Sequence, residues 1–212
     1  MKFVLAITTY NRLDYLKTCL DSWSKTKGKH DWRIIIADDG SEDDTISYIK
    51  SNFPNVELIQ NKRVGVHNQM NSILSMLSSM DFDLCFKIDD DIEFLKAGWD
   101  ELYYNKAKET GYWHLVYSEP KWAKEQELKE PVREIGLIGK NSLLNVHGFF
   151  YTISKDMLDK VGYFDVENFG FRGMGHVDYT ARACRAGFNQ IEHPFDVEGS
   201  ENYISAHKEA YE

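Results

Sequence analysis

The fold is decided by the segment Leu84-Cys85-Phe86-Lys87-Ile88-Asp89-Asp90-Asp91, a short apolar run that ends at three consecutive carboxylates. Residues 3–7 and 33–37 form two earlier apolar runs, and a polar cluster follows each of them. Stretches with apolar residues at helical spacing separate these runs along the chain. This alternation predicts right-handed βαβ units and an α/β fold, in which a single doubly wound, mainly parallel sheet carries helices on both faces.

The second half of the chain has a looser pattern. We expect helices over residues 96–110, 155–161 and 176–186, and strands over residues 114–117 and 149–153. Within the first half, Asn11 is a candidate cap for the helix that follows the first strand. The chain has 212 residues, which fits one domain, so we expect a single domain over residues 1–212.

Composition narrows the classes of partner and compartment. The formal net charge is −9, which makes nucleic acid an unlikely main partner because its affinity rests on basic surface. Three widely spaced cysteines contain no C-x-x-C pair, which is typical of reduced thiols in a cytoplasmic protein. We find no apolar run of the ~18–20 residues that a membrane span requires, so we expect no membrane span.

The polar clusters that follow the three apolar runs should meet at one edge of the sheet. They are Thr8-Thr9-Tyr10-Asn11-Arg12, Asp38-Asp39-Gly40-Ser41 and Asp89-Asp90-Asp91. Ligands of parallel sheets bind at the carboxyl ends of the strands. Three adjacent carboxylates repel one another unless a cation neutralises them. Such oxygen ligands select Mg²⁺ or Mn²⁺, which are commonly shared with phosphates, so the cluster indicates a metal–diphosphate complex and a nucleotide-linked substrate.

Several motifs in order resemble family 2 glycosyltransferases with the GT-A fold. The first three are T-T-Y-N-R at 8–12, A-D-D-G-S at 37–41 and K-I-D-D-D-I at 87–92. Further on, H-G-F-F-Y-T-I-S at 147–154 with V-G-Y-F-D at 161–165, and G-H-V-D-Y-T-A-R at 175–182, are similar to the acceptor-side segments of that family. The likeness covers roughly residues 3–193. It departs from the family at Met70, where an Arg is frequent, and at His176, where the catalytic Asp usually stands.

The resemblance implies a role for each polar cluster. Residues 1–95 would bind the nucleotide sugar, which we expect to be UDP-linked, and residues 96–212 would bind a carbohydrate or glycoconjugate acceptor. Tyr10 would stack on the base, Asp39 would accept a base N–H, and Asp91 would ligate the metal that bridges the two phosphates. The implied nucleotide-binding residues are Thr8, Tyr10, Arg12, Asp38, Asp39, Asp89 and Asp90, and Asp89 and Asp91 are the implied metal ligands.

Inverting transfer is a single displacement that needs one general base. Asp178 and His176 are the two candidates at the start of the predicted helix over 176–186. In register with Arg182, His176 occupies the usual position of the family's base, and an imidazole has a suitable unperturbed pKa of about 6.5. We favour Asp178 because the family uses a carboxylate base, and we retain His176 as the alternative.

A further metal ligand is expected from the C-terminal tail, because related enzymes commonly supply a histidine from that region. Only His193 and His207 follow the predicted helix over 176–186. Pro194 beside His193 favours a structural role for that residue, so His207 is the candidate ligand. Imidazole suits Mn²⁺ better than Mg²⁺, and we therefore expect a preference for Mn²⁺.

Two other classes of protein remain as alternatives. A sugar nucleotidyltransferase also combines a metal with a doubly wound sheet, but it holds its triphosphate with a glycine-rich loop after the first strand. Residues 8–11 contain no glycine. A non-catalytic module that binds nucleotide sugars would lack an acidic residue near 176–178, which the presence of Asp178 disfavours.

Overall fold

A five-stranded sheet forms the centre of the molecule in the computed structural model, which describes residues 1–120, 131–140 and 142–207. The strand order is β3-β2-β1-β4-β8, and β8 alone runs antiparallel to its neighbour. The strands are β1 (Lys2–Thr9), β2 (Asp31–Asp38), β3 (Glu57–Gln60), β4 (Leu84–Asp89) and β8 (Phe150–Ile153). The predicted α/β class with a mainly parallel sheet is confirmed.

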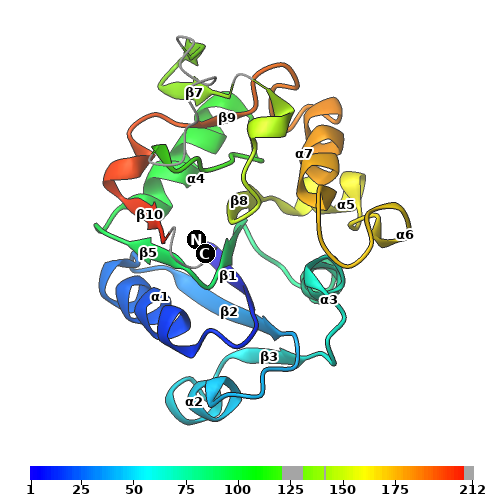
Figure 1. Cartoon of the computed structure of the whole chain (residues 1–212). Coiled ribbons are helices and arrows are strands. Elements are labelled where there is room, and N and C mark those ends of the chain that lie inside the picture. The colour runs from blue at the N-terminus through cyan, green and yellow to red at the C-terminus, as the bar shows by residue number, and fades with distance from the viewer. Residues whose placement is uncertain (121–130, 141, 208–212) are drawn as a thin grey trace.

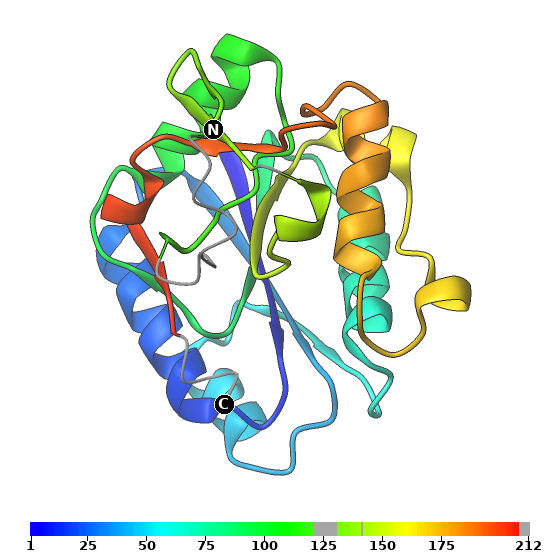
Figure 2. The ribbon, with the colours of Figure 1, turned by 45° about the horizontal axis from the view of Figure 1, so that its top comes forward.

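Helices cover both faces of this sheet, as Figures 1 and 2 show. One face packs against α1 (Leu13–Thr26), α2 (Thr45–Asn52) and α4 (Trp99–Thr110). The other face packs against α3 (Val66–Ser78), α5 (Lys155–Val161) and α7 (Gly175–Arg185). The central strands therefore bury side chains on both faces, which explains why their sequences are continuously apolar instead of alternating.

Short strands outside the main sheet were not predicted. They are β5 (Ile92–Phe94) paired with β10 (Ile204–Ala206), and β6 (Arg133–Glu134), β7 (Leu137–Gly139) and β9 (Phe195–Val197) in a second small sheet. The remaining elements are α6 (Val166–Phe169) and two short 3₁₀ helices, η3 (Leu143–Asn145) and η4 (Ser200–Asn202). Pairing of β10 with β5 brings the end of the described chain beside the acidic cluster that follows β4.

Two local predictions were wrong. Asn11 does not cap α1: its side-chain oxygen accepts a hydrogen bond from the Glu42 backbone, and its backbone has a φ of 50°. Asn11 therefore ties the loop after β1 to the loop after β2. Residues 114–117 do not form a strand, although Val116 makes an isolated antiparallel bridge to Tyr151.

The described part of the chain has no helix with both the length and the apolar character to cross a membrane. Cys19, Cys85 and Cys184 are all buried free thiols.

Candidate active site

The polar clusters after β1 and β4 meet at the carboxyl edge of the sheet. Thr8 is level with Asp89 in the parallel pairing of these strands, and its hydroxyl donates to Asp89 Oδ1 at 2.8 Å. The next hydroxyl along β1, that of Thr9, donates to Asp90 Oδ2 at 2.7 Å. The two threonines therefore fix the orientation of the first two carboxylates in the acidic cluster.

A cavity of about 290 Å³ opens at this edge, and we call it the strand-end cavity. Six of the predicted site residues line it: Thr8, Tyr10, Arg12, Asp39, Asp89 and Asp90. Thr9, Arg63, Val66, Gln69, Phe171 and Arg172 complete the lining. Asp38 and Asp91 are buried and lie outside this lining.

Asp39 and Arg63 form an ion pair at one end of the strand-end cavity, with Nη1 and Oδ2 3.1 Å apart. The Asp39 carboxylate also accepts hydrogen bonds from the backbone N–H groups of Val64 and Gly65. The Arg63 guanidinium lies 3.5 Å from the centroid of the Tyr10 ring. A flat, positively charged group therefore already stacks on Tyr10 beside the carboxylate, which is the arrangement that a nucleobase with a donor N–H requires.

Asp38 has a different role. Its Oδ1 accepts hydrogen bonds from the backbone N–H groups of Gly40 and Ser41, both at 2.9 Å. These contacts close the turn after β2. Asp38 thereby shapes the loop that presents Asp39.

The three carboxylates after β4 differ in their surroundings. Asp89 accepts a hydrogen bond from the buried Lys87 ammonium, and that ammonium also donates to the Gly148 carbonyl at 2.7 Å. Burial raises the pKa of Asp90 to about 7, and the Thr9 hydrogen bond and Arg12 only partly oppose this shift. Asp90 Oδ1 and Asp91 Oδ2 lie 3.4 and 3.2 Å from the same Arg12 nitrogen.

The acidic cluster fits a divalent cation that is shared with a ligand. Asp90 and Asp91 already converge on one cationic nitrogen of Arg12, at distances longer than the ~2.7–2.9 Å of a strong charge-assisted hydrogen bond. No group of three or more His, Cys, Asp or Glu side chains within residues 1–120, 131–140 and 142–207 is arranged to hold a metal ion. Protein carboxylates would therefore fill only part of an octahedral shell, and phosphate oxygens and water would fill the rest.

His207 lies next to the acidic cluster through its backbone. Its N–H donates to the Asp91 carbonyl at 3.0 Å, in continuation of the β5–β10 pairing. Its imidazole Nε2 lies 3.2 Å from Glu93 Oε2, and about a third of the side chain is exposed. The backbones of His207 and Asp91 are therefore in contact, while the His207 ring faces Glu93.

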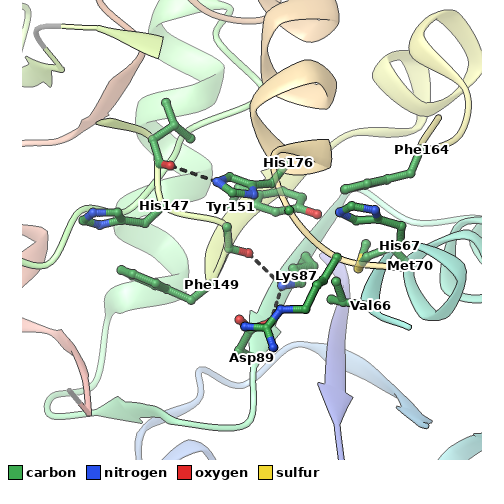
Figure 3. Close-up of a pocket in the computed structure, with 14 residues that line it drawn as sticks. Val66, His67, Met70, Lys87, Asp89, His147, Phe149, Tyr151, Phe164 and His176 are labelled. Atoms are coloured by element: carbon green, nitrogen blue, oxygen red, sulfur yellow. Dashed lines mark hydrogen bonds and ion pairs between the residues drawn. The ribbon is translucent and has the colours of Figure 1, made fainter. Parts of the chain in front are cut away.

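A second cavity of about 360 Å³ adjoins the first, and we call it the inner cavity (Figure 3). Val66, Asp89 and Arg172 line both cavities, so the two are continuous. The remaining lining residues come from α3, β4, β8, α7 and the loops between them: His67, Met70, Lys87, Val146, His147, Gly148, Phe149, Tyr151, Phe164, Gly173 and His176. This lining is aromatic, with polar groups at a few positions, as is usual for a small-molecule site.

The two base candidates occupy different surroundings. His176 lines the inner cavity, and its Nε2 lies 3.1 Å from the Val146 carbonyl. Burial lowers the pKa of His176, and the nearby Lys87 ammonium lowers it further. Asp178 lies outside this lining, and its Oδ2 accepts a hydrogen bond from Arg182 Nε at 2.8 Å. A Cβ at position 148 would lie 2.9 Å from His176 Cγ, so glycine there makes room for the imidazole.

Several lining residues were missing from the predicted site, among them Arg63, Lys87, Arg172 and His67. Lys87 is a charged residue inside an otherwise apolar strand, and this pattern is the sequence signal that could have indicated it. The structure shows that it is 2% exposed, and a buried lysine is rare unless it is paired. Arg63 has a φ of 55°, which no sequence pattern indicates. Arg172 and His67 reach the cavities through the loop between α6 and α7 and the first turn of α3.

A mainly parallel sheet with an acidic cavity at its carboxyl edge defines an α/β domain, and sequence comparison identifies its family. The profile described as Glycosyl transferase family 2 matches residues 4–172. The chain belongs to this family. A search among curated protein sequences found no match.

Solved structures confirm the GT-A fold that the sequence motifs predicted. S. aureus TarS (residues 1–349) in complex with UDP-GlcNAc superimposes with a TM-score of 0.69 at 18% identity, over 98% of this chain and 59% of that one. The mannosyltransferase PcManGT from Pyrobaculum calidifontis, in complex with GDP-Man and Mn²⁺, gives 0.68 at 14% identity, over 91% and 54%. GalNAc-T7 with UDP, GalNAc and Mn²⁺ gives 0.71 at 14%, over 97% and 44%. The chain thus spans about half the length of these proteins.

Proposed function

We propose that the protein is an inverting, metal-dependent hexosyltransferase that moves a sugar from a nucleoside-diphosphate sugar, preferably UDP-linked, to a hydroxyl of a carbohydrate or glycoconjugate. The observation that carries this proposal is the continuity of the two cavities at Asp89 and Arg172. A nucleotide in the strand-end cavity places its diphosphate at this junction and the attached sugar in the inner cavity, where His176 lies.

Donor binding uses the strand-end cavity. The base stacks on Tyr10 and donates an N–H to Asp39, in place of the present contact with Arg63. Arg172, which lines both cavities, and Arg12, which contacts the acidic cluster, are the cations we assign to the diphosphate. The UDP, UDP-GlcNAc and GDP-Man complexes of the structural neighbours support a nucleotide donor.

The chemical step is a displacement at the anomeric carbon. The acceptor oxygen forms a bond to this carbon while the bond to the diphosphate oxygen breaks. His176 takes the proton from the acceptor hydroxyl, because its lowered pKa keeps the ring neutral at physiological pH. The ring is oriented by its contact with the Val146 carbonyl and by a hydrogen bond to the Gly173 backbone. Asp178 holds Arg182, which also donates to the carbonyls of Val161 and Tyr163.

We propose Asp91 and Asp90 as the residues that would hold Mn²⁺ or Mg²⁺, with Asp89 directed to the ribose or to the same ion. When bound, the ion supplies positive charge to the diphosphate leaving group. The Mn²⁺ complexes of PcManGT and GalNAc-T7 support this proposal, and His207 is the residue in reach that would favour Mn²⁺.

We further propose one functional unit, in which residues 1–95 supply the nucleotide side and residues 96–212 the acceptor side. The pairing of β8 with β4 joins the two parts in one sheet and supports this division. A cytoplasmic location is also proposed, because all three cysteines are free and buried.

The test is calorimetric titration of UDP, GDP, UDP-GlcNAc and GDP-Man with Mn²⁺, followed by an assay of nucleotide release. Asp39→Asn should weaken nucleotide binding about 10–100-fold, as expected for a hydrogen bond to a charged group. Asp38→Asn is the matched control, because an amide oxygen still accepts from Gly40 and Ser41, and its affinity should equal that of the wild type. Wild-type protein that binds none of the four compounds would overturn the proposal.

A further inference from the structure

The hydroxyl of Tyr151 is buried in the wall of the inner cavity without a hydrogen-bond partner in the described part of the chain. Tyr151 lies on β8 and is 2% exposed. Figure 3 shows its side chain between His176 and His67, with the hydroxyl directed toward His67. A buried hydroxyl without a partner is costly, and a position beside a cavity indicates that a ligand supplies the partner.

The polar atoms around this hydroxyl define what the ligand can be. His67 Nδ1 lies 2.8 Å from the Gly170 carbonyl, and His176 Nε2 lies 3.1 Å from the Val146 carbonyl. A carbonyl only accepts, so in the neutral His67 ring Nδ1 carries the proton and Nε2 is an acceptor, whereas the His176 ring also has a hydrogen bond to the Gly173 backbone. Burial lowers the pKa of His176 and therefore favours its neutral ring.

The Tyr151 hydroxyl, which can donate, beside the acceptor Nε2 of His67 suits a group that both donates and accepts. A sugar hydroxyl does both. A carboxylate or a phosphate only accepts, so it would leave His67 Nε2 unpaired. The ammonium of Lys87, another donor in the cavity, is already directed at Asp89 and at the Gly148 carbonyl, and Arg172 lies at the junction with the strand-end cavity.

We infer that the Tyr151 hydroxyl, together with His67, recognises a ring hydroxyl of the sugar and so determines which sugar is used. This inference rests on the proposed function. The junction at Asp89 and Arg172 leads from the diphosphate position into the inner cavity, so the recognised hydroxyl belongs to the donor sugar. An acceptor sugar offers the same chemistry, and the experiment separates the two sources.

Tyr151→Phe removes only the hydroxyl, and Tyr179→Phe is its matched control. Tyr179 is also fully buried with a hydroxyl that has no partner among the described residues, but it does not line the cavity. Loss of an unsatisfied buried hydroxyl should raise the Tm of both unliganded variants by about 2–4 °C. Only Tyr151→Phe should change sugar recognition.

Calorimetry measures the Kd of UDP and UDP-GlcNAc, and of GDP and GDP-Man, so that the ratio within each pair reports what the sugar contributes. In Tyr151→Phe we expect an unchanged nucleotide Kd and a nucleotide-sugar Kd that is about 3–10-fold higher. Saturation-transfer NMR with free monosaccharides added to the nucleotide-saturated protein is the acceptor arm. If Tyr151→Phe loses only monosaccharide binding and keeps the nucleotide-sugar Kd, the Tyr151 hydroxyl recognises a hydroxyl of the acceptor sugar.

Three results would overturn the inference, and they can be distinguished from one another. An unchanged sugar contribution in Tyr151→Phe, with no loss in the monosaccharide arm, overturns the inference and leaves the proposed function intact. Wild-type protein that binds neither nucleotides nor nucleotide sugars overturns both. An equal loss in Tyr179→Phe would also overturn it, because a hydroxyl outside the cavity would then have the same effect.

Discussion

Replacement of the imidazole at position 176 should separate catalysis from binding. His176→Ala removes the only group we assign to the acceptor proton, while the strand-end cavity keeps all its lining residues. A positioned general base contributes about 10²–10⁴-fold to a rate. We therefore expect kcat to fall by this factor, which corresponds to about 3–5 kcal/mol of barrier, with little change in the Kd of the nucleotide sugar.

Asp178→Asn is the matched control on the same helix. The ion pair between Asp178 and Arg182 is partly exposed, at 23% and 29% of the two side chains. Arg182 keeps its hydrogen bonds to the Val161 and Tyr163 carbonyls when the charge is removed. A pair of this kind contributes at most about 1 kcal/mol, so Tm should fall by about 4 °C or less, with kcat within a few-fold of the wild type.

The pH profile provides an independent check. A general base must be deprotonated, and the pKa of His176 lies below the ordinary 6.5 because burial and the Lys87 ammonium disfavour the imidazolium. The acid limb of wild-type kcat should therefore lie below pH 6.5, with activity falling as pH falls through it. Added imidazole should partly restore His176→Ala. If His176→Ala keeps near-normal kcat with saturating donor, or if Asp178→Asn loses 10²-fold, the assignment of the base to His176 is refuted.

Three further predictions concern the metal, the diphosphate and the core. Asp91→Asn should abolish Mn²⁺-dependent binding of the nucleotide sugar without loss of fold, which calorimetry with and without EDTA measures. His207→Ala should raise the Mn²⁺ concentration needed for half-maximal rate, which a Mn²⁺ titration of activity measures. Unaltered values would exclude Asp91 and His207, respectively, as metal ligands. Arg172→Ala should weaken UDP about 10–100-fold and leave uridine unchanged, because the lost contact is to phosphate, and an equal effect on uridine would contradict this reasoning. Asp196 is fully buried with its pKa raised to about 6 by desolvation, so the folded state holds a proton that the unfolded state releases above about pH 4. Urea unfolding should show that stability falls from pH 4 to pH 6 by up to about 3 kcal/mol more in the wild type than in Asp196→Asn, whereas parallel curves would disprove the linkage.

The strand ends were the most predictable part of the molecule. The apolar residues of paired parallel strands set the register between the strands. This register places Thr8 of β1 opposite Asp89 of β4 and Ala37 of β2. Six polar residues predicted from these ends line one cavity. Local sequence was sufficient here because each residue is fixed by the strand that precedes it.

Residues that reach the site from loops could not be predicted in the same way. Arg172 lies between α6 and α7, and its neighbour Phe171 packs against Gly65, where a Cβ would lie 2.3 Å from the Phe171 carbonyl oxygen. This contact joins segments more than a hundred residues apart. β10 has only three residues, too few for an alternating pattern to be recognised, yet it brings His207 to Asp91.

The ion pairs of the site give a reason why the acidic cluster should bind the metal ion and the diphosphate together. Asp39 faces Arg63, Asp89 faces Lys87, and Arg12 serves Asp90 and Asp91 together. A diphosphate that attracts Arg12 withdraws the cation from two buried carboxylates, and a buried carboxylate without a cation is costly. A divalent ion at the same place restores that charge and contacts the phosphates as well. Binding of the metal and of the diphosphate should therefore strengthen one another by the same factor, because coupling between two ligands is reciprocal.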